Sequence, residues 1–453
     1  MEGQTEEKPM AVDVNHPNRK GETGPEWGWV ERSVWTNRML EALVTGVKGG
    51  KWYSLMDKVF AKRNLHAAYI KVARNKGSAG VDRVTIRQFE KNLERQIDFL
   101  HESLSKGTYK PLEIKRVEIT KPGSKEKRPL GIPAVRDRVV QTALRSVLEP
   151  IFENDFAKHS YGFRPKRGCK DALRRVDGLL KQGKRWVIDL DFKSYFDTIP
   201  HEQLMRKVEV KVGDRKVLAL VQSFLTQRVM EAMKSWKPTG GTPQGAVISP
   251  LLSNIYLDDL DHLMAAQGRE MVRYADDAVV LCDSEEEAHA VMDQLKSWTE
   301  QAGLTLHPTK TQIVEMSKPG GFDFLGYHFE VSRKNPNTIN RWPRKKSAKA
   351  LRQKLKPLMK RSNGHSLGAI IQKINPTLKG WFGYFKHSKA STFPQMDGWV
   401  RMRLRSILRK RAGRRGRGRG QDHHRWPNSY FHKLGLFSMT LAHSLAKSAL
   451  RTS

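Results

Sequence analysis

The chain has few cysteines: Cys169 and Cys282 are the two among 453 residues, and they lie far apart in the sequence. A cysteine-based zinc ribbon is therefore excluded, and a disulfide scaffold is not expected, which fits a reducing compartment. No apolar run reaches the length of a membrane-spanning helix. The first residues, MEGQTEEKPMAVDVNHPNRKGE, contain no hydrophobic signal core. We expect a cytoplasmic protein, free in the cytosol or in the nucleoid, with no membrane partner.

Acidic residues are also scarce. The 82 lysines and arginines outnumber the 47 aspartates and glutamates, which gives a formal net charge of +35 and a sequence pI near 10.2. So much charge of one sign repels itself, and a polyanion relieves that repulsion. A ribosomal-type or merely soluble basic protein is the alternative. Long apolar-periodic segments and aromatic residues argue against a disordered basic tail, so nucleic acid is the expected partner.

The length allows several domains with buried cores, and the composition changes along the chain. Residues 1–30 are polar and rich in glycine, proline and charge, and we expect them to be disordered. Residues 31–330 mix helical and strand patterns, which predicts an α+β domain. Residues 341–408 have a wholly helical rhythm, and residues 409–422 are an Arg/Gly-rich run expected to be a flexible basic linker. Residues 423–453 contain enough apolar residues for a small helical cap.

The helical region is expected to form three helices with one basic face. The first ends before Pro376, the second begins after it, and the third spans Met396–Leu408 with Arg401, Arg403 and Arg405 turned outwards. A flexible cationic run can bind RNA without a fixed fold, although a solvated linker is the alternative. The arginines expected to contact nucleic acid here are Arg401, Arg405, Arg414, Arg415, Arg417 and Arg419.

The centre of the sequence is Tyr274-Ala275-Asp276-Asp277, which separates two apolar runs and predicts a strand, a tight turn and a second strand. Aspartate suits turns, so this motif alone is only suggestive. A third carboxylate comes from Trp186–His201, where Asp189 and Asp191 project from one face of a predicted strand. Asp191 stands at the end of that strand, and its position favours it as the reactive one. Another carboxylate of this stretch is expected to be an N-cap or an ion-pair partner.

Three carboxylates cannot crowd together without a counter-charge, because their mutual repulsion raises their pKa values. Mg²⁺ takes oxygen ligands and keeps room for water and phosphate. Two such ions can activate a primer 3′-hydroxyl and stabilise leaving pyrophosphate in an in-line displacement. We therefore predict that Asp191, Asp276 and Asp277 hold two Mg²⁺ ions, for which Mn²⁺ can substitute. Three unrelated structural aspartates are the alternative.

Further stretches carry groups suited to a triphosphate. Lys121 and Arg128 flank a hairpin predicted within Leu112–Pro133, where they can converge on phosphates; a solvated charged hairpin is an equally good interpretation. Gln244 lies in a Gly/Pro-rich turn whose amides can approach a nucleotide closely. Lys310 lies between two predicted short strands.

A basic and aromatic stretch, His159–Ala172, places Arg164, Lys166 and Arg167 near Tyr161 and Phe163. Basic residues that alternate with aromatic ones suit contact with a nucleic-acid backbone and stacking on bases. The alternative is a loop whose aromatic side chains fill the edge of the core.

Several of these stretches, taken in order, resemble the sequence blocks of group II intron-encoded reverse transcriptases. The blocks are NKGSAGVD, ITKPGSKEKRPLGIP, SYGFRP, DFKSYFD, GTPQGAVISPLLSN, YADD, LHPTKT and FLGYHF, within about residues 70–330. The later stretch INPTLKGWFGYF resembles the thumb, or maturase, domain of that family. The resemblance implies a right-hand polymerase architecture, with fingers and palm in residues 31–330 and an all-α thumb/maturase domain in residues 341–408.

The resemblance also implies roles for single residues. Asp191, Asp276 and Asp277 match the catalytic aspartates, and the backbone carbonyl of Phe192 is expected to complete the metal ligands.

Five more residues match the dNTP-binding residues of the family. Lys121 and Arg128 match fingers residues that meet the triphosphate, and Lys310 matches a lysine near the phosphates. Phe196 matches the aromatic residue that excludes a ribose 2′-hydroxyl, and Gln244 matches the glutamine of the nucleotide pocket.

The implied function is RNA-directed DNA synthesis, together with binding of the parent intron RNA to assist its splicing and support its retromobility. The implied partners are intron RNA, an RNA template with a DNA primer, dNTPs and target DNA, for a monomer or homodimer. Many members end in an HNH endonuclease with cysteine pairs, and this chain has no such module; His423 and His424 are weak ligand candidates. Second-strand cleavage is thus not expected. The alternatives are a splicing-only RNA-binding maturase and a reverse transcriptase recruited to phage defence.

Overall fold

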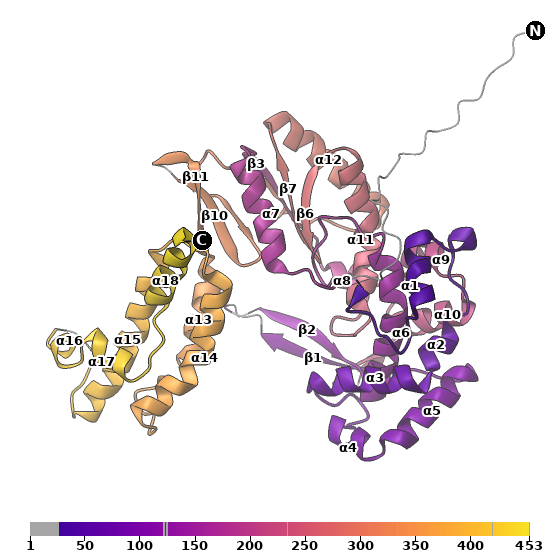
Figure 1. Ribbon diagram of the computed structural model, residues 1–453, viewed down its shortest axis with the longest axis horizontal. Coiled ribbons are helices and arrows are strands. Elements are labelled where there is room, and N and C mark those ends of the chain that lie inside the picture. The colour runs from indigo at the N-terminus through magenta and orange to yellow at the C-terminus, as the bar shows by residue number, and fades with distance from the viewer. Residues whose placement is uncertain are drawn as a thin grey trace, which may run out of the picture.

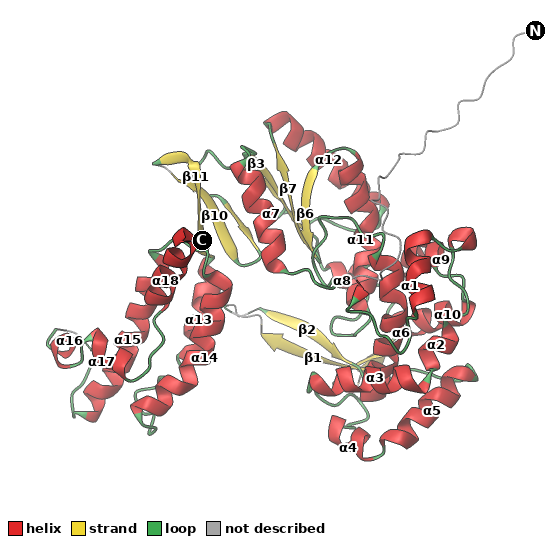
Figure 2. Ribbon diagram, in the orientation of Figure 1, coloured by secondary structure: helices red, strands yellow, loops and turns green. Residues whose placement is uncertain are grey.

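The computed structural model describes residues 27–120, 123, 126–232, 234–332, 334–418 and 420–452. It has the expected α+β fold, with three sheets and a helical C-terminal part (Figure 1, Figure 2). The elements before the first strand are α1 (Asn37–Thr45), η2 (Lys48–Gly50), α2 (Met56–Phe60), α3 (Lys62–Arg74), α4 (Ile86–Lys91) and α5 (Leu93–Ser105). Trp27 and Val30 are buried in the hydrophobic core that these helices help to form. The prediction of disorder up to residue 30 is therefore wrong for residues 27–30, and residues 1–26 lie outside the described part.

The predicted fingers hairpin is part of a four-stranded sheet with the order β2-β1-β4-β5. Its strands are β1 (Ile114–Thr120), β2 (Lys127–Ile132), β4 (Val229–Glu231) and β5 (Lys234–Trp236). The alternation that predicted β1 is correct, and β1 pairs antiparallel with β2. It also pairs parallel with β4, more than a hundred residues later in the chain. The hairpin is thereby attached at its base to a distant segment.

A buried carboxylate fastens that base. Asp137, in the first turn of α6 (Val135–Glu153), accepts hydrogen bonds from the Tyr109 hydroxyl, from the Leu112 amide at 3.1 Å and from Gln227 Nε2 at 3.2 Å. Leu112 precedes β1 and Gln227 precedes β4, so one carboxyl group holds the starts of both parallel strands. Burial raises the pKa of Asp137 to about 6, although the Tyr109 bond and the charge of Arg136 oppose the shift.

The central antiparallel sheet has the order β6-β7-β3-β8. Its strands are β3 (Trp186–Asp191), β6 (Glu270–Tyr274), β7 (Asp277–Cys282) and β8 (Gln312–Glu315). Side chains alternate between two cores, because successive residues of a strand point to opposite faces. Val187 and Val279 pack with α7 (Cys169–Lys181), whereas Ile188 and Val280 pack with α11 (Ser249–Ala266) and α12 (Glu285–Gln301).

The remaining helices of this part are α8 (Tyr195–Thr198), α9 (His201–Lys211) and α10 (Arg215–Leu225). Asp214 caps the start of α10, where its side chain accepts from the amides of Lys216 and Val217 at 3.0 and 3.2 Å. The same carboxylate accepts from the amides of Leu55 and Met56 at 2.8 and 2.9 Å. Although burial alone would raise the pKa of Asp214, these amides lower it overall.

A small sheet with the order β11-β10-β9 joins the palm to the C-terminal helices. Its strands are β9 (Phe322–Phe324), β10 (Tyr327–Ser332) and β11 (Asn335–Pro343). Two tyrosines make the joint: Tyr327 donates to the carbonyl of Tyr384 at 2.6 Å, and Tyr384 donates to the carbonyl of Leu325 at 2.7 Å. The domain boundary predicted at residue 330 is wrong, because it would cut through strand β10.

The C-terminal helices are α13 (Lys345–Leu355), α14 (Leu367–Phe385), α15 (Thr392–Arg411), α16 (Asp422–Arg425), α17 (Asn428–Lys433) and α18 (Met439–Thr452). The predicted break at Pro376 is wrong, since α14 continues through it with Ile374 and Leu378 fully buried on either side. None of the described helices is both long and apolar enough to cross a membrane.

The predicted flexible linker 409–422 is also partly wrong. Residues Arg409–Arg411 are the last turn of α15, and Arg409 Nη1 lies 2.7 Å from the buried Asp422 carboxylate. Gly418 packs so closely on α15 that a Cβ on it would lie 2.5 Å from the Cβ of Arg405. The described residues of this run, 409–418 and 420–422, are therefore folded back against the helix that precedes them.

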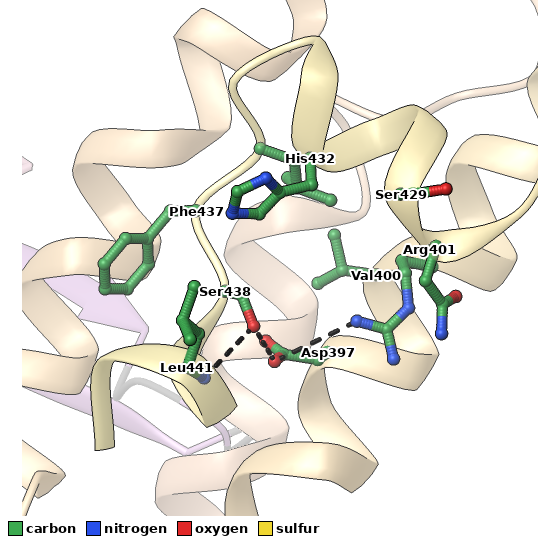
Figure 3. Close-up of a pocket in the computed structure, with 10 residues that line it drawn as sticks. Asp397, Val400, Arg401, Ser429, His432, Phe437, Ser438 and Leu441 are labelled. Carbon is green, nitrogen blue, oxygen red and sulfur yellow. Dashed lines mark hydrogen bonds and ion pairs between the residues drawn. The ribbon is translucent and has the colours of Figure 1, made fainter. Parts of the chain in front are cut away.

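A cavity of about 260 Å³ lies where α15, α17 and α18 meet (Figure 3). Its floor is the buried Asp397, which accepts from the Ser438 hydroxyl at 2.9 Å and from the amides of Met439 and Thr440 at 3.1 and 3.0 Å. The carboxylate thus caps the start of α18. Arg401 Nη1 stands 4.0 Å from it.

Candidate active site

The predicted aspartates lie at one edge of the central sheet. Asp191 ends β3 and is the cross-strand partner of Asp277, the first residue of β7. Asp276 stands in the turn between β6 and β7, after Ala275, which has a positive φ of 60°. The structure therefore brings the three predicted catalytic residues to the same edge.

The end of β3 is held from the other side by the segment before β8. The His307 amide donates to the Asp191 carbonyl at 2.8 Å, and the Thr311 hydroxyl donates to the same oxygen at 3.1 Å. Lys310 Nζ lies 3.3 Å from both carboxylate oxygens of Asp191. Lys310 is thus placed beside the predicted site, where its charge meets that of Asp191.

The carboxyl groups at this edge lack a full complement of positive charge. Burial, with the nearby charge of Asp276, raises the pKa of Asp277 to about 7. Burial likewise raises the pKa of Asp276. The pKa of Asp189 rises to about 7, through burial and then through the charges of Asp277 and Asp191. Among the described residues, no three His, Cys, Asp or Glu side chains converge as metal ligands do. The oxygen donors nevertheless fit a hard divalent cation, because such an ion supplies the missing positive charge.

Phe192, whose carbonyl is the fourth predicted ligand, follows Asp191 and forms an isolated antiparallel bridge with Leu306. The bonds of the bridge run from the Lys193 amide to the Thr305 carbonyl and from the His307 amide to the Asp191 carbonyl, each at 2.8 Å. The Phe192 carbonyl takes no part in those two bonds.

The predicted nucleotide residues Arg128 and Gln244 contact each other. Arg128 Nε on β2 donates to Gln244 Oε1 at 2.7 Å, and the Gly131 amide donates to the Gln244 carbonyl at 2.6 Å. Gly245 has a φ of 106°, and a Cβ on it would lie 2.4 Å from the Gly131 oxygen. Glycine is therefore required for the hairpin and this loop to meet. Lys121 lies outside the described residues, as do Pro122, Ser124 and Lys125. At Gly123, which is described, a Cβ would lie 2.7 Å from the carbonyl oxygen of Lys346 on α13.

Phe196, the predicted sugar-sensing residue, is buried in α8. Its carbonyl accepts from the Thr242 amide at 2.6 Å. Gly241 has a φ of 85°, and a Cβ on it would lie 2.7 Å from the same oxygen, so glycine fits this position for both reasons. His201 adds a hydrogen bond that the sequence did not reveal: its Nε2 lies 2.7 Å from the Gly241 carbonyl. A histidine at the start of a helix carries no local sign of this contact.

Two of the residues predicted to contact nucleic acid are buried, so the prediction is wrong for Arg164 and Arg405. Arg164 is buried, with its Nε 3.0 Å from both oxygens of Glu153 and its Nη1 2.6 Å from the Ala157 carbonyl. Arg405, predicted to face outwards, is buried and donates to the Trp426 carbonyl and to Asn428 Oδ1, each at 2.9 Å. Both guanidinium groups therefore make hydrogen bonds within the protein and do not face solvent.

The other basic residues are accessible to differing degrees. Lys166 is exposed, Arg167 is half-buried with its guanidinium over the Tyr161 ring, and Arg401 is half-buried beside Asp397. The loop arginines Arg414, Arg415 and Arg417 are exposed, and Arg419 lies outside the described residues. A basic surface therefore exists on the C-terminal helices and the loop after α15.

Two known protein families match this chain, one in its N-terminal α+β part and one in its C-terminal helical part. Residues 119–329 match the family described as reverse transcriptase (RNA-dependent DNA polymerase), and residues 348–426 match the group II intron, maturase-specific domain. The second match runs through the predicted linker and ends in α16.

Three similar proteins each align with part of this chain. The group II intron-encoded protein LtrA of Lactococcus lactis subsp. cremoris is 39% identical over 198 residues, which are 43% of this chain and 32% of LtrA. Protein YkfC of Escherichia coli K12 is 34% identical over 287 residues, 55% of this chain and 74% of YkfC. A chain of a solved partial Cas6-RT-Cas1–Cas2 complex aligns over 55% of this chain and 42% of its own length, with 25% identity and a TM-score of 0.36.

The chain spans about a third of the length of LtrA. Its two matched domains stand in the order expected from the sequence blocks, and the second is the group II intron, maturase-specific domain. The protein therefore belongs to the reverse transcriptase family, in the group whose members carry a group II intron maturase domain.

Proposed function

We propose that this protein is an RNA-directed DNA polymerase that also binds group II intron RNA and assists its splicing. The observation that carries the proposal is the pairing of Asp191 with Asp277 across β3 and β7, with Asp276 in the adjoining turn. Carboxylates fixed at one sheet edge can act on the same phosphoryl group, whereas carboxylates scattered over a surface cannot.

Asp191, Asp276 and Asp277, with the Phe192 carbonyl, would hold two Mg²⁺ ions, or Mn²⁺ in their place. When bound, the ions would lower the pKa of the primer 3′-hydroxyl and neutralise charge on the leaving pyrophosphate. The raised pKa values of Asp276 and Asp277 support this assignment, because buried carboxyl groups that lack counter-charge favour a cation.

The surrounding residues would select and orient the nucleotide. Arg128 and Gln244, joined by a hydrogen bond between β2 and the glycine loop, would contact the incoming dNTP, and Lys121 would add a second phosphate contact. Lys310 would exchange its contact with Asp191 for a phosphate. Phe196 would stand against the sugar and exclude a 2′-hydroxyl.

The basic C-terminal part would bind RNA. Arg401, Arg414, Arg415, Arg417 and Arg419, with Lys166 and Arg167 of the palm, are the proposed contacts to intron RNA or to the template–primer duplex. Splicing assistance and retromobility into a target DNA would follow from this binding. A cytoplasmic monomer or homodimer would suffice for either role.

Two alternatives remain distinct from this proposal. A splicing-only maturase would bind intron RNA without DNA synthesis, and a defence-associated reverse transcriptase would synthesise DNA without an intron partner. The grouping of the aspartates beside Lys310 favours an active polymerase over the first. The maturase-specific match favours an intron partner over the second.

The test is primer extension by the full chain on an RNA template with dNTPs, with and without Mg²⁺. The variant Asp276→Ala should abolish synthesis yet bind RNA as the native chain does. The matched control is Asp283→Ala, which removes an exposed carboxylate at the other end of β7, paired with Lys184 at 2.9 Å, and should leave synthesis unchanged. If the folded native chain binds RNA but makes no cDNA, the splicing-only maturase is correct instead.

A further inference from the structure

Arg273 lies in β6 just before the Ala275 turn. Its side chain is fully buried, and each guanidinium nitrogen donates a hydrogen bond. Its Nε lies 2.8 and 3.0 Å from the two carboxylate oxygens of Asp261. Nη1 donates to Asn254 Oδ1 at 3.0 Å and to the Ala275 carbonyl at 2.9 Å, and Nη2 donates to the Ser160 hydroxyl at 2.8 Å. One guanidinium group therefore joins α11, the loop at residue 160 and the turn that carries Asp276.

Such a group is costly to bury, and a buried ion pair can often be replaced by apolar side chains without loss of stability. Asp261 and Asn254 are themselves buried in α11. An apolar replacement would lose the hydrogen bonds to Asn254 Oδ1, to the Ser160 hydroxyl and to the Ala275 carbonyl, and the last of these holds the turn directly. The distinctive contact of Arg273 is thus with the turn.

Ala275 needs to be held. Its φ of 60° is in the left-handed region, which non-glycine residues rarely adopt unless their surroundings enforce it. The backbone of Gly162 supports the turn from behind, where a Cβ would lie 2.2 Å from the Ala275 amide nitrogen. Asn254 Nδ2 donates to the Gly162 carbonyl at 2.8 Å. The same network therefore holds the turn directly, through Nη1, and indirectly, through Asn254 and Gly162.

Backbone bonds close the arrangement. The Arg273 amide donates to the His159 carbonyl at 3.0 Å, and the Tyr161 amide donates to the Arg273 carbonyl at 2.8 Å. The loop at residues 159–161 is thus paired with β6 at Arg273, two residues before Ala275. Any loosening at Arg273 would be passed to Asp276 and Asp277, which follow Ala275 without an intervening residue.

We propose that Arg273 is a positioning residue that holds the Ala275 turn, and thereby sets the divalent-cation affinity of Asp276 and Asp277. The inference rests on the proposed function, since it gives these two carboxylates the metal ions. Groups that orient metal ligands typically change metal affinity by about 10- to 100-fold when they are altered.

The test variant is Arg273→Lys in the full chain. Lysine keeps the positive charge beside Asp261, but its single ammonium group cannot reach Asp261, Asn254, Ser160 and the Ala275 carbonyl together. The matched control is Arg175→Lys, which alters a guanidinium paired with Glu270 at the opposite end of β6. The measurements are Mn²⁺ binding by electron paramagnetic resonance without nucleotide, and the Mg²⁺ concentration for half-maximal primer extension.

We expect Arg273→Lys to weaken Mn²⁺ binding and to raise the half-maximal Mg²⁺ concentration, each by about tenfold or more, with RNA affinity unchanged. The control should stay within about twofold on both. A second substitution, Ala275→Gly, should restore most of the loss in Arg273→Lys, because glycine adopts a positive φ without strain. A merely structural arginine would not be rescued by that glycine.

Native metal affinity in Arg273→Lys, or failure of Ala275→Gly to improve it, would overturn the proposal. If Arg273→Lys does not fold, Asn254→Ala removes the contact to Gly162 and one partner of Arg273, and it should produce the same loss and rescue; unchanged metal affinity there would also overturn it. If the native chain makes no cDNA, the proposed polymerase function is refuted, while the Mn²⁺ titration still tests the role of Arg273. A native chain that binds no Mn²⁺ would overturn both.

Discussion

Replacing Asp137 by asparagine should stabilise this protein above pH 6. The carboxyl group is fully buried at the base of the fingers sheet, where its pKa is raised to about 6 from an ordinary value of 3.8. Between those two values the folded protein holds a proton that the unfolded chain has lost. Stability therefore falls as the pH rises from about 4 to about 6, and remains lower at neutral pH.

The size of the effect follows from the two pKa values. A difference of about two pH units corresponds to about 3 kcal/mol of lost stability above pH 6. Asparagine has nearly the same shape and remains neutral. Its Oδ1 can accept from the Leu112 amide and Gln227 Nε2, and its Nδ2 can donate to the Tyr109 hydroxyl. We therefore expect the free energy of unfolding of Asp137→Asn to exceed that of the native protein by up to about 3 kcal/mol at pH 8. Near pH 4 the gain should shrink to below about 1 kcal/mol.

The assay is urea unfolding followed by tryptophan fluorescence at pH values from 4 to 8. Asp214→Asn is the matched control with the opposite sign, because backbone amides lower the pKa of Asp214. That carboxylate stabilises the fold above its unfolded pKa, and its contribution is lost as the pH falls through the folded value. Asp214→Asn should thus destabilise at pH 8 and less so at pH 4. If Asp137→Asn destabilises the protein at pH 8 as well, its partners stabilise the ionised form and the reasoning is wrong.

Three further outcomes follow from the site. Phe196→Ala should permit ribonucleotide incorporation, measured as the ratio of rNTP to dNTP efficiency, while an unchanged ratio would remove Phe196 from sugar selection. Gln244→Ala frees Arg128 from its 2.7 Å bond and should raise KM for dNTP by about 10-fold, the cost of one lost charge-assisted hydrogen bond; an effect confined to kcat would contradict a binding role. Replacing the exposed loop arginines Arg414, Arg415 and Arg417 by alanine should weaken RNA affinity. The slope of log affinity against log salt should fall by about one for each phosphate group that the protein no longer binds. An unchanged slope would show that the loop has no role in RNA binding.

The sequence was informative where function depends on neighbours in the chain. Asp276 and Asp277 occur in a strand–turn–strand pattern, and alternation placed Asp191 at a strand end, so the shared edge could be anticipated once β3 and β7 were assumed to pair. Burial of basic residues could not be anticipated in this way. Arg164 is inside because Glu153 meets it, and Arg405 because Trp426 and Asn428 do. A helical pattern alone does not reveal such partners.

Long-range pairing was the other limit. No local feature of Ile114–Thr120 predicts a parallel partner at Val229. Likewise, no local feature of β2 predicts that Arg128 contacts Gln244, more than a hundred residues later. Pro376 is the reverse case: a local rule predicted a break, but the apolar residues on both sides keep α14 continuous. In Met271-Val272-Arg273 a charged residue shares a strand face with the buried Met271, which is the local sign of a buried network that the strand pattern alone passed over.

The strand order β6-β7-β3-β8 has a consequence for biosynthesis. β3 lies inside the sheet, yet both its partners follow it, and β8 begins more than a hundred residues after β3 ends. A ribosome that adds roughly 5–20 residues per second needs on the order of ten seconds to deliver them. Until β7 is made, both edges of Trp186–Asp191 are unpaired, and until β8 is made one edge stays open; unpaired edges are templates for aggregation. The nascent chain therefore has a window in which a chaperone can cover the unpaired strand before the palm forms.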